Sequence, residues 1–388
     1  QAEESPSSSS PHPDSSSPSL ANPAARLLSG ASRKLSRATA LGSTRTGEAD
    51  KDVVDEVARE ATVTTLTSMA DTLALSESSR VATLFGELSL ADALFNPSTI
   101  PEFTDRGRRK AVANRSENVA KSRDPGAILV PEKTRVKLDT SGFYSRDSSD
   151  FINASYVVPK GGGARVYIAT QAPLEATMAH LWQMAFSKGA RTVVCLCPDD
   201  ELISKEVYWP AADMGEASRT FGSLSVSYAS IVSGIRTLGG GSVVRRDFML
   251  VKTAKGAQRE TRRLVHLQLN VPFASAEAVD ALGVLCNAVD VASAGPARLA
   301  GKSSQPSPEE RPIIVHDVLG AGRAAAFILL HAERANSRIL GEAGRPVTFN
   351  FPAAIAHLRS QRPALKPSVK ELEVVLRVLL SRQSSDAK

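Results

Sequence analysis

The strongest candidate for chemistry is the segment 313–327, which reads IIVHDVLGAGRAAAF. Its apolar start predicts a buried strand, its glycines predict a tight loop, and its alanine-rich end predicts a helix. Such a loop gathers backbone N–H groups and a positive helix end around a small anion, and Arg323 would add a planar, charged donor. From this segment alone, a tight strand-to-helix turn that needs Gly320 and Gly322 only for its backbone conformation stays an open alternative.

The surrounding segments predict the sheet that would position this loop. Strand patterns at 164–170 and 191–198 enclose a helical pattern at 175–190. This strand–helix–strand unit indicates an α/β protein with a mixed sheet. Further antiparallel strands are expected over 220–228, 241–253 and 263–269, and further helices over 275–291, 347–359 and 368–380.

The N-terminal part of the chain has a different composition. Residues 1–48 are rich in Ser and Pro and poor in large apolar groups, which predicts a disordered tail. A helical lead-in over 49–83 follows, and the folded domain is predicted over 84–384. The chain opens with Gln rather than Met, which is consistent with a processed form from which a signal segment has been removed.

Composition excludes several classes of protein. The 388 residues carry 47 Lys and Arg against 41 Asp and Glu, and this mild net charge of +6 gives no indication of a nucleic-acid partner. Three cysteines rule out a disulfide framework and a four-cysteine zinc site. No apolar run reaches the roughly 18 residues of a transmembrane segment.

Motifs in the same order along the chain resemble those of the classical protein tyrosine phosphatases. The loop of that family reads His-Cys-Ser-X-Gly-X-Gly-Arg-Thr/Ser-Gly, where residues 316–325 read HDVLGAGRAA. The resemblance runs in register from about Leu84 to Leu380 and implies a twisted mixed sheet flanked by helices. The other matching segments are Asn114–Arg115 with Thr134–Val136, DFINASY at 150–156, YIATQAP at 167–173, Trp182 with Met184, YWP at 208–210 and LRSQRP at 358–363.

The phosphate loop departs from the family pattern at its chemical centre. The nucleophilic cysteine is replaced by Asp317, and the hydroxyl residue that follows the arginine is replaced by Ala324. A carboxylate is a weaker nucleophile than a thiolate, and it puts negative charge where the phosphate must bind. We therefore expect Asp317 to act as an internal anion that occupies the N–H cradle and pairs with Arg323, in a loop crowded by Val318 and Leu319.

Three other family positions have also changed. No Trp-Pro-Asp general-acid motif exists in the chain, and Asp280 lies too far into the next helix to replace it. Ser116 stands where the resemblance implies a tyrosine that stacks on phosphotyrosine. Pro367 stands where it implies a glutamine that positions the hydrolytic water.

Loss of chemical residues with retention of scaffold motifs indicates a pseudophosphatase, a catalytically inactive domain that serves as a protein-binding or scaffold module. One alternative is a residual hydrolase in which Asp317 accepts the phosphoryl group, which would require Mg²⁺ and further carboxylates. The other alternative is a phosphopeptide binder without turnover that uses Gly320, Gly322 and Arg323.

No cofactor or metal site is expected from the sequence. His316 would hydrogen-bond to the backbone at the end of its strand, His180, His266 and His357 show no metal-ligand spacing, and Cys195, Cys197 and Cys286 are interpreted as core residues. The partner would be a protein of unknown identity, and a phosphotyrosine peptide is disfavoured as a ligand. We expect the chain to bind no nucleic acid and to contain no transmembrane segment. The protein would be either secreted, for example as a pathogen effector that acts on host cells, or cytoplasmic.

Overall fold

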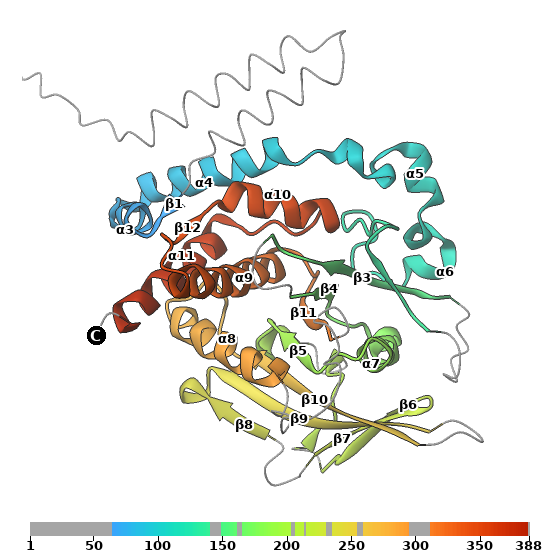
Figure 1. Ribbon diagram of the computed structural model, residues 1–388. Helices are drawn as coiled ribbons and strands as arrows, with labels where there is room; N and C mark the ends of the chain where they lie inside the picture. The colour runs from blue at the N-terminus through green and yellow to red at the C-terminus, as the bar shows by residue number, and fades with distance from the viewer. Residues whose placement is uncertain are drawn as a thin grey trace, which may run out of the picture. The chain divides into compact units, whose positions relative to one another are not determined.

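The computed structural model describes residues 64–139, 149–160, 165–202, 206–212, 215–229, 235–253, 259–294 and 311–386 (Figure 1). The predicted disordered tail and the first part of the predicted lead-in lie outside these residues. Every helix and strand labelled in Figure 1 belongs to the described residues.

A ten-stranded mixed sheet forms the centre of the described residues, and it confirms the predicted α/β class. The strand order is β2-β3-β4-β11-β5-β10-β9-β7-β6, and β8 pairs with β9 outside this path. The central strands β4, β11, β5 and β10 are parallel, and all five residues of β11 are buried. A strand buried on both faces gives a continuous apolar run rather than an alternating one. The bounds are β2 Arg135–Lys137, β3 Phe151–Val157, β4 Tyr167–Gln171, β5 Thr192–Cys195, β6 Ser218–Phe221, β7 Leu224–Tyr228, β8 Ile235–Leu238, β9 Val243–Lys252, β10 Glu260–Leu269 and β11 Ile313–Asp317.

Helices cover the two faces of the sheet unequally (Figure 1). On one face, Val194 and Leu196 pack in a large core with α8 (Ala278–Ala294), α9 (Gly322–Glu342) and α11 (Val369–Asp386). On the other face, Val193 and Cys195 pack in a second core with α7 (Met178–Ser187). The remaining elements are β1 Thr64–Thr65, α3 Leu66–Ala74, α4 Glu77–Leu94, α5 Asp105–Lys110, α6 Ser116–Val119, β12 Thr348–Phe349 and α10 Phe351–Gln361, with short 3-10 turns between several of them.

Several element bounds differ from the sequence prediction for identifiable reasons. The strand predicted over 220–228 is a hairpin, because Gly222 turns the chain with a φ of +63° between β6 and β7. The helix predicted from 347 begins later, because Asn350 caps α10 by accepting a hydrogen bond from the Ala353 N–H. Strands β2 and β3 carry the family-like motifs but were not predicted as strands.

The helices that precede the sheet belong to its core. Met69 of α3 and Leu84 and Leu88 of α4 are buried in the same cluster as the apolar face of α11. Arg80 of α4 also forms an ion pair of 3.0 Å with Glu373 of α11. Residues on both sides of the predicted boundary at 83/84 therefore share one core. In the described part of the chain, no helix combines the length and the apolar character that crossing a membrane requires.

Candidate functional site

The glycine-containing loop joins the end of β11 to the start of α9, at the edge of the sheet where the parallel strands end. The Ala172 N–H donates to the Asp317 carbonyl oxygen over 2.7 Å and ties the loop to the end of β4. Gly320 has a φ of +67°, and a Cβ added there would lie 2.4 Å from the Thr170 carbonyl group. Both the left-handed conformation and the close approach to β4 therefore require glycine.

The carboxylate of Asp317 points into its own loop and accepts hydrogen bonds from four backbone N–H groups. The donors are Leu319 at 2.8 Å, Gly320 at 2.5 Å, Ala321 at 3.2 Å to each oxygen, and Ala324 at 2.9 Å. Asp317 is 4% exposed, so these bonds lie away from bulk water. The protein's own carboxylate thus uses the N–H groups that such a loop would otherwise offer to an external anion.

Arg323 pairs with Glu201 and not with Asp317, which corrects the pairing expected from the sequence. Its guanidinium lies 2.6 Å from a Glu201 carboxylate oxygen and donates to the Leu196 carbonyl over 2.9 Å. Burial alone would lower the pKa of Arg323, but the hydrogen bond and charge of Glu201, together with the charges of Cys197 and Asp317, outweigh burial and raise it. The cation at the helix start therefore already has an internal partner.

Arg362 supports the loop from behind. It is fully buried, and it donates to the carbonyls of Gly320 at 2.8 Å and Leu319 at 3.2 Å and to Asn153 at 2.8 Å. Burial lowers the pKa of Arg362 to about 10, while the charge of Asp317 acts in the opposite direction. By binding these carbonyls, Arg362 holds the peptide groups with their N–H sides toward Asp317.

The structure also places the other positions that the resemblance singled out. Ala324 is fully buried and contributes only its backbone N–H to the site. Asp280 is an exposed residue in the first turn of α8, and the preceding Pro272 is exposed as well. Pro367 is buried just before α11. In the first turn of α11, the Glu371 carboxylate lies close to Gly322, since one of its oxygens would be 2.9 Å from a Cβ added there. A second carboxylate therefore lies against the loop.

Ser116 makes a local contact, whereas Arg123 contacts the turn beside the loop. It is exposed at the start of α6, and its hydroxyl donates to Glu117. Arg123 instead contacts the turn beside the loop, since its backbone N–H donates to Gln171 at 3.0 Å and its guanidinium donates to the Ala172 carbonyl at 2.8 Å. These contacts place Arg123 beside the loop.

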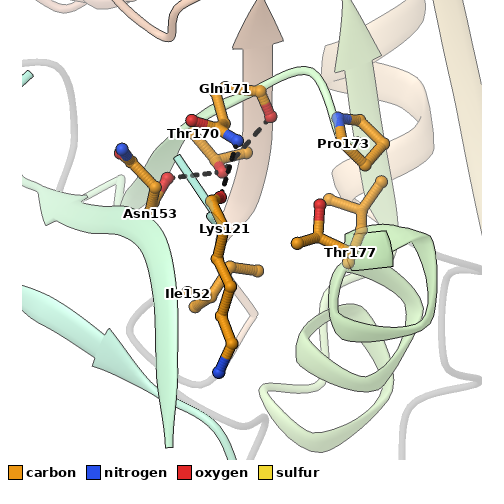
Figure 2. Close-up of a pocket in the computed structure, with 8 residues that line it drawn as sticks. Lys121, Ile152, Asn153, Thr170, Gln171, Pro173 and Thr177 are labelled. Carbon is orange, nitrogen blue, oxygen red and sulfur yellow. Dashed lines mark hydrogen bonds between the residues drawn. The ribbon is translucent and has the colours of Figure 1, made fainter. Parts of the chain in front are cut away.

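A small pocket with mixed polar and apolar lining adjoins the same turn (Figure 2). Lys121, Asn153, Gln171 and Thr177 are among the residues that line it, and the Gln171 side chain donates to the Lys121 carbonyl over 3.0 Å. Its volume is about 10 Å³, which is at the lower limit for one water molecule. A phosphotyrosine ring would not fit in this pocket.

A buried group of cysteine and histidine side chains lies directly beneath the loop, and sequence reasoning missed it. One ligand atom each from Cys195, His266 and His316 lie within 4.8 Å of one another. The Tyr208 hydroxyl is hydrogen-bonded to Nε2 of His316 at 2.7 Å and to Nε2 of His266 at 2.8 Å. His316 therefore contacts a side chain, whereas a backbone partner was expected.

Electrostatics keep His266 of this group and the neighbouring Cys197 uncharged. Burial lowers the pKa of His266 far below its usual value, and the nearby Arg246 lowers it further. The side-chain contact with Cys195, followed by burial, raises the pKa of the Cys197 thiol. The histidine is therefore a neutral imidazole and Cys197 a neutral thiol at physiological pH.

Comparisons with known proteins agree with these observations. A sequence model described as "Protein-tyrosine phosphatase" matches residues 118–381. The chain is 30% identical over 270 residues to receptor-type tyrosine-protein phosphatase-like N of Mus musculus, a match that covers 69% of this chain and 24% of that protein. It is 27% identical over 271 residues to receptor-type tyrosine-protein phosphatase N2 of Mus musculus, covering 68% and 24%. It is also 27% identical over 279 residues to tyrosine-protein phosphatase non-receptor type 12 of Homo sapiens, covering 69% and 31%. The chain thus spans only a quarter to a third of the length of these relatives.

Proposed function

Because this chain belongs to the protein-tyrosine phosphatase family, we propose that its domain is a catalytically inactive member of that family, which serves as a protein-binding or scaffold module. The observation that carries this proposal is the Asp317 carboxylate in the N–H cradle of the phosphate loop. A phosphate group could enter only after these hydrogen bonds were broken.

Electrostatics oppose phosphate binding while Asp317 is ionised. Like charges about 4 Å apart repel by about 4 kcal/mol per unit pair at an effective dielectric constant near 20. A phosphotyrosine dianion would face this repulsion from Asp317 and a smaller one from Glu371 beside Gly322. It would also have to compete with Glu201 for Arg323.

The site also lacks the groups that turnover requires. No thiol occupies the nucleophile position, since Asp317 stands there, and Ala324 has no hydroxyl to assist a leaving group. General acid catalysis contributes about 10²–10⁴-fold to rates of this kind, and Asp280 is exposed on α8 rather than in a loop over the site. The name of one relative, "phosphatase-like", fits a domain that keeps the fold without the chemistry.

A peptide assay tests the inactive site directly. The purified full chain is incubated with a phosphotyrosine peptide, with Mg²⁺ or with EDTA, and phosphate release is followed. We expect no release above the buffer rate. Sustained Mg²⁺-dependent release that is lost in Asp317→Asn would instead establish an aspartyl-phosphate hydrolase.

Calorimetry with the same peptide separates the remaining alternative. We expect the phosphorylated peptide to bind no more tightly than its unphosphorylated twin. Micromolar affinity that depends on the phosphate would establish a phosphopeptide binder.

The protein-binding role needs a measurement of its own. The proteins that the folded domain captures are compared with those that a Phe85→Ser variant captures. Phe85 is 62% exposed on α4, so its replacement should leave the fold intact. Each captured protein is then titrated, after purification, against both forms of the domain. Absence of any protein that binds the folded domain with micromolar or better affinity would contradict the scaffold role.

A further inference from the structure

The buried cysteine and histidine group lies on three adjacent parallel strands at the α7-facing side of the sheet. His316 of β11 is directly opposite Cys195 of β5. His266 of β10 is opposite Val193, two residues before Cys195 on the same face of β5. All three side chains are 0% exposed. The strand register therefore brings together three donor atoms that lie far apart in the sequence.

The two histidines have unused ring nitrogens. Both Nε2 atoms share the Tyr208 hydroxyl, whereas neither Nδ1 atom has a hydrogen-bond partner among the described residues. The phenol donates to one Nε2 and accepts from the other, so one ring is left with a buried Nδ1–H and the other with a buried Nδ1 lone pair. Unsatisfied buried polar atoms usually have a functional or structural explanation, because each costs about 1–3 kcal/mol.

We propose that Cys195, His266 and His316 form a buried binding site for a thiophilic divalent metal ion of the Zn²⁺ class. One thiolate with two imidazoles is a donor set that suits Zn²⁺ and excludes Mg²⁺ and Ca²⁺, which take oxygen ligands. Cys197, whose thiol interacts with both Cys195 and His316, is the candidate for a fourth ligand. The proton of each coordinating thiol is released to solvent when the ion binds.

The dimensions of the group are close to those of a zinc site. Bonds of about 2.0–2.3 Å in a tetrahedral site place ligand atoms about 3.3–3.8 Å apart. The donor atoms here lie within 4.8 Å of one another, so the ligands must move inward by about 1 Å. Tyr208 would then act as the outer partner that orients both rings, as hydrogen-bonded groups behind metal-binding histidines commonly do.

Metal titration of the full chain tests this site without any reference to enzymatic activity. The protein is treated with a chelator, exchanged into chelator-free buffer, and titrated with Co²⁺ and then with Zn²⁺. We expect one equivalent of Co²⁺ to give the ligand-field and thiolate charge-transfer absorption of a tetrahedral site, and Zn²⁺ to displace it. Mg²⁺ should give no binding.

Matched variants assign the site to particular residues. Cys195→Ser should abolish the Co²⁺ spectrum, whereas Cys286→Ser, which changes an equally buried thiol in α8, should retain it. Tyr208→Phe should weaken Zn²⁺ affinity by about 10–100-fold. Equal Co²⁺ spectra in the Cys195 and Cys286 variants, or no binding by the wild-type chain, would overturn the proposal.

A wild-type measurement covers the case in which Cys195→Ser does not fold. In mild denaturant, thiol alkylation is mapped by mass spectrometry with and without Zn²⁺. We expect Zn²⁺ to slow alkylation of Cys195 relative to Cys286. The same rates for both cysteines with and without Zn²⁺ would show that no ion binds at this group.

Discussion

Replacement of Asp317 by alanine is the most direct perturbation of the loop. It removes the carboxylate that accepts hydrogen bonds from four backbone N–H groups. Hydrogen bonds to a charged group each contribute about 1.5–3 kcal/mol, but water entering the cradle and the relief of a buried charge offset much of their sum. We expect a net decrease of about 2–4 kcal/mol in the free energy of unfolding.

The empty cradle of the variant should then bind an external anion. Sulfate at about 100 times its dissociation constant would restore about 2.7 kcal/mol by mass action. Equilibrium denaturation is measured with sulfate and with chloride at equal ionic strength, for the wild type, Asp317→Ala and the control Asp280→Ala. Asp280 is exposed, so its variant matches the change in charge and reports the general stabilising effect of sulfate.

The comparison has a clear refuting result. If sulfate stabilises all three proteins equally and Asp317→Ala unfolds like the control, the carboxylate does not fill an anion cradle. A large loss of stability without any specific response to sulfate would show instead that Val318 and Leu319 close the loop to external anions.

Three further perturbations have defined outcomes. Asp317→Cys should release no phosphate from a phosphotyrosine peptide, because the general acid, worth about 10²–10⁴-fold, is still missing, and measurable turnover would contradict this reasoning. Burial raises the pKa of Glu87 from 4.5 to about 7, so the fold loses stability as the pH rises through this interval. Glu87→Gln should therefore add about 1–3 kcal/mol to the free energy of unfolding at pH 8 but nothing below pH 4.5. Thermal unfolding of both proteins at these two pH values would show the difference. Gly320→Ala should lower the free energy of unfolding by about 2–5 kcal/mol, because its Cβ would overlap a β4 carbonyl. Gly344→Ala should lower it by only about 1–2 kcal/mol, because Gly344 has a φ of +64° but no atom within 4 Å of an added Cβ. Equal losses in chemical denaturation would refute the steric argument.

Local features of the sequence were predictable because their causes are local. The apolar run of β11, the glycines after it and the alanine-rich start of α9 specify a strand, a turn and a helix without help from distant residues. The placement of Asp317 in the loop follows from its position directly at the end of the strand. A short carboxylate side chain there can reach only the N–H groups of the next few residues.

The partners of these residues were not predictable because they depend on strand order. Glu201 reaches Arg323 only because β5 lies beside β11 in the sheet, and the sequence does not specify that neighbour. The group formed by Cys195, His266 and His316 likewise depends on the register of three parallel strands. The spacing of Cys195 and Cys197 was a local signal, since residues two apart in an extended segment point to the same side, and both cysteines lie in the core that contains α7.

The internal carboxylate explains how this loop keeps its shape without an external anion. Backbone N–H groups that converge on one point need an anion there, because buried donors without an acceptor are costly. The family pattern implies that in other members a cysteine thiolate and a bound phosphate take that place. Here Asp317 accepts from the same donors, while Arg362 holds the opposite sides of the peptide groups. On the proposed function, Asp317 both takes the place of the nucleophile and supplies the charge that stabilises the loop, so the loop is complete without a substrate.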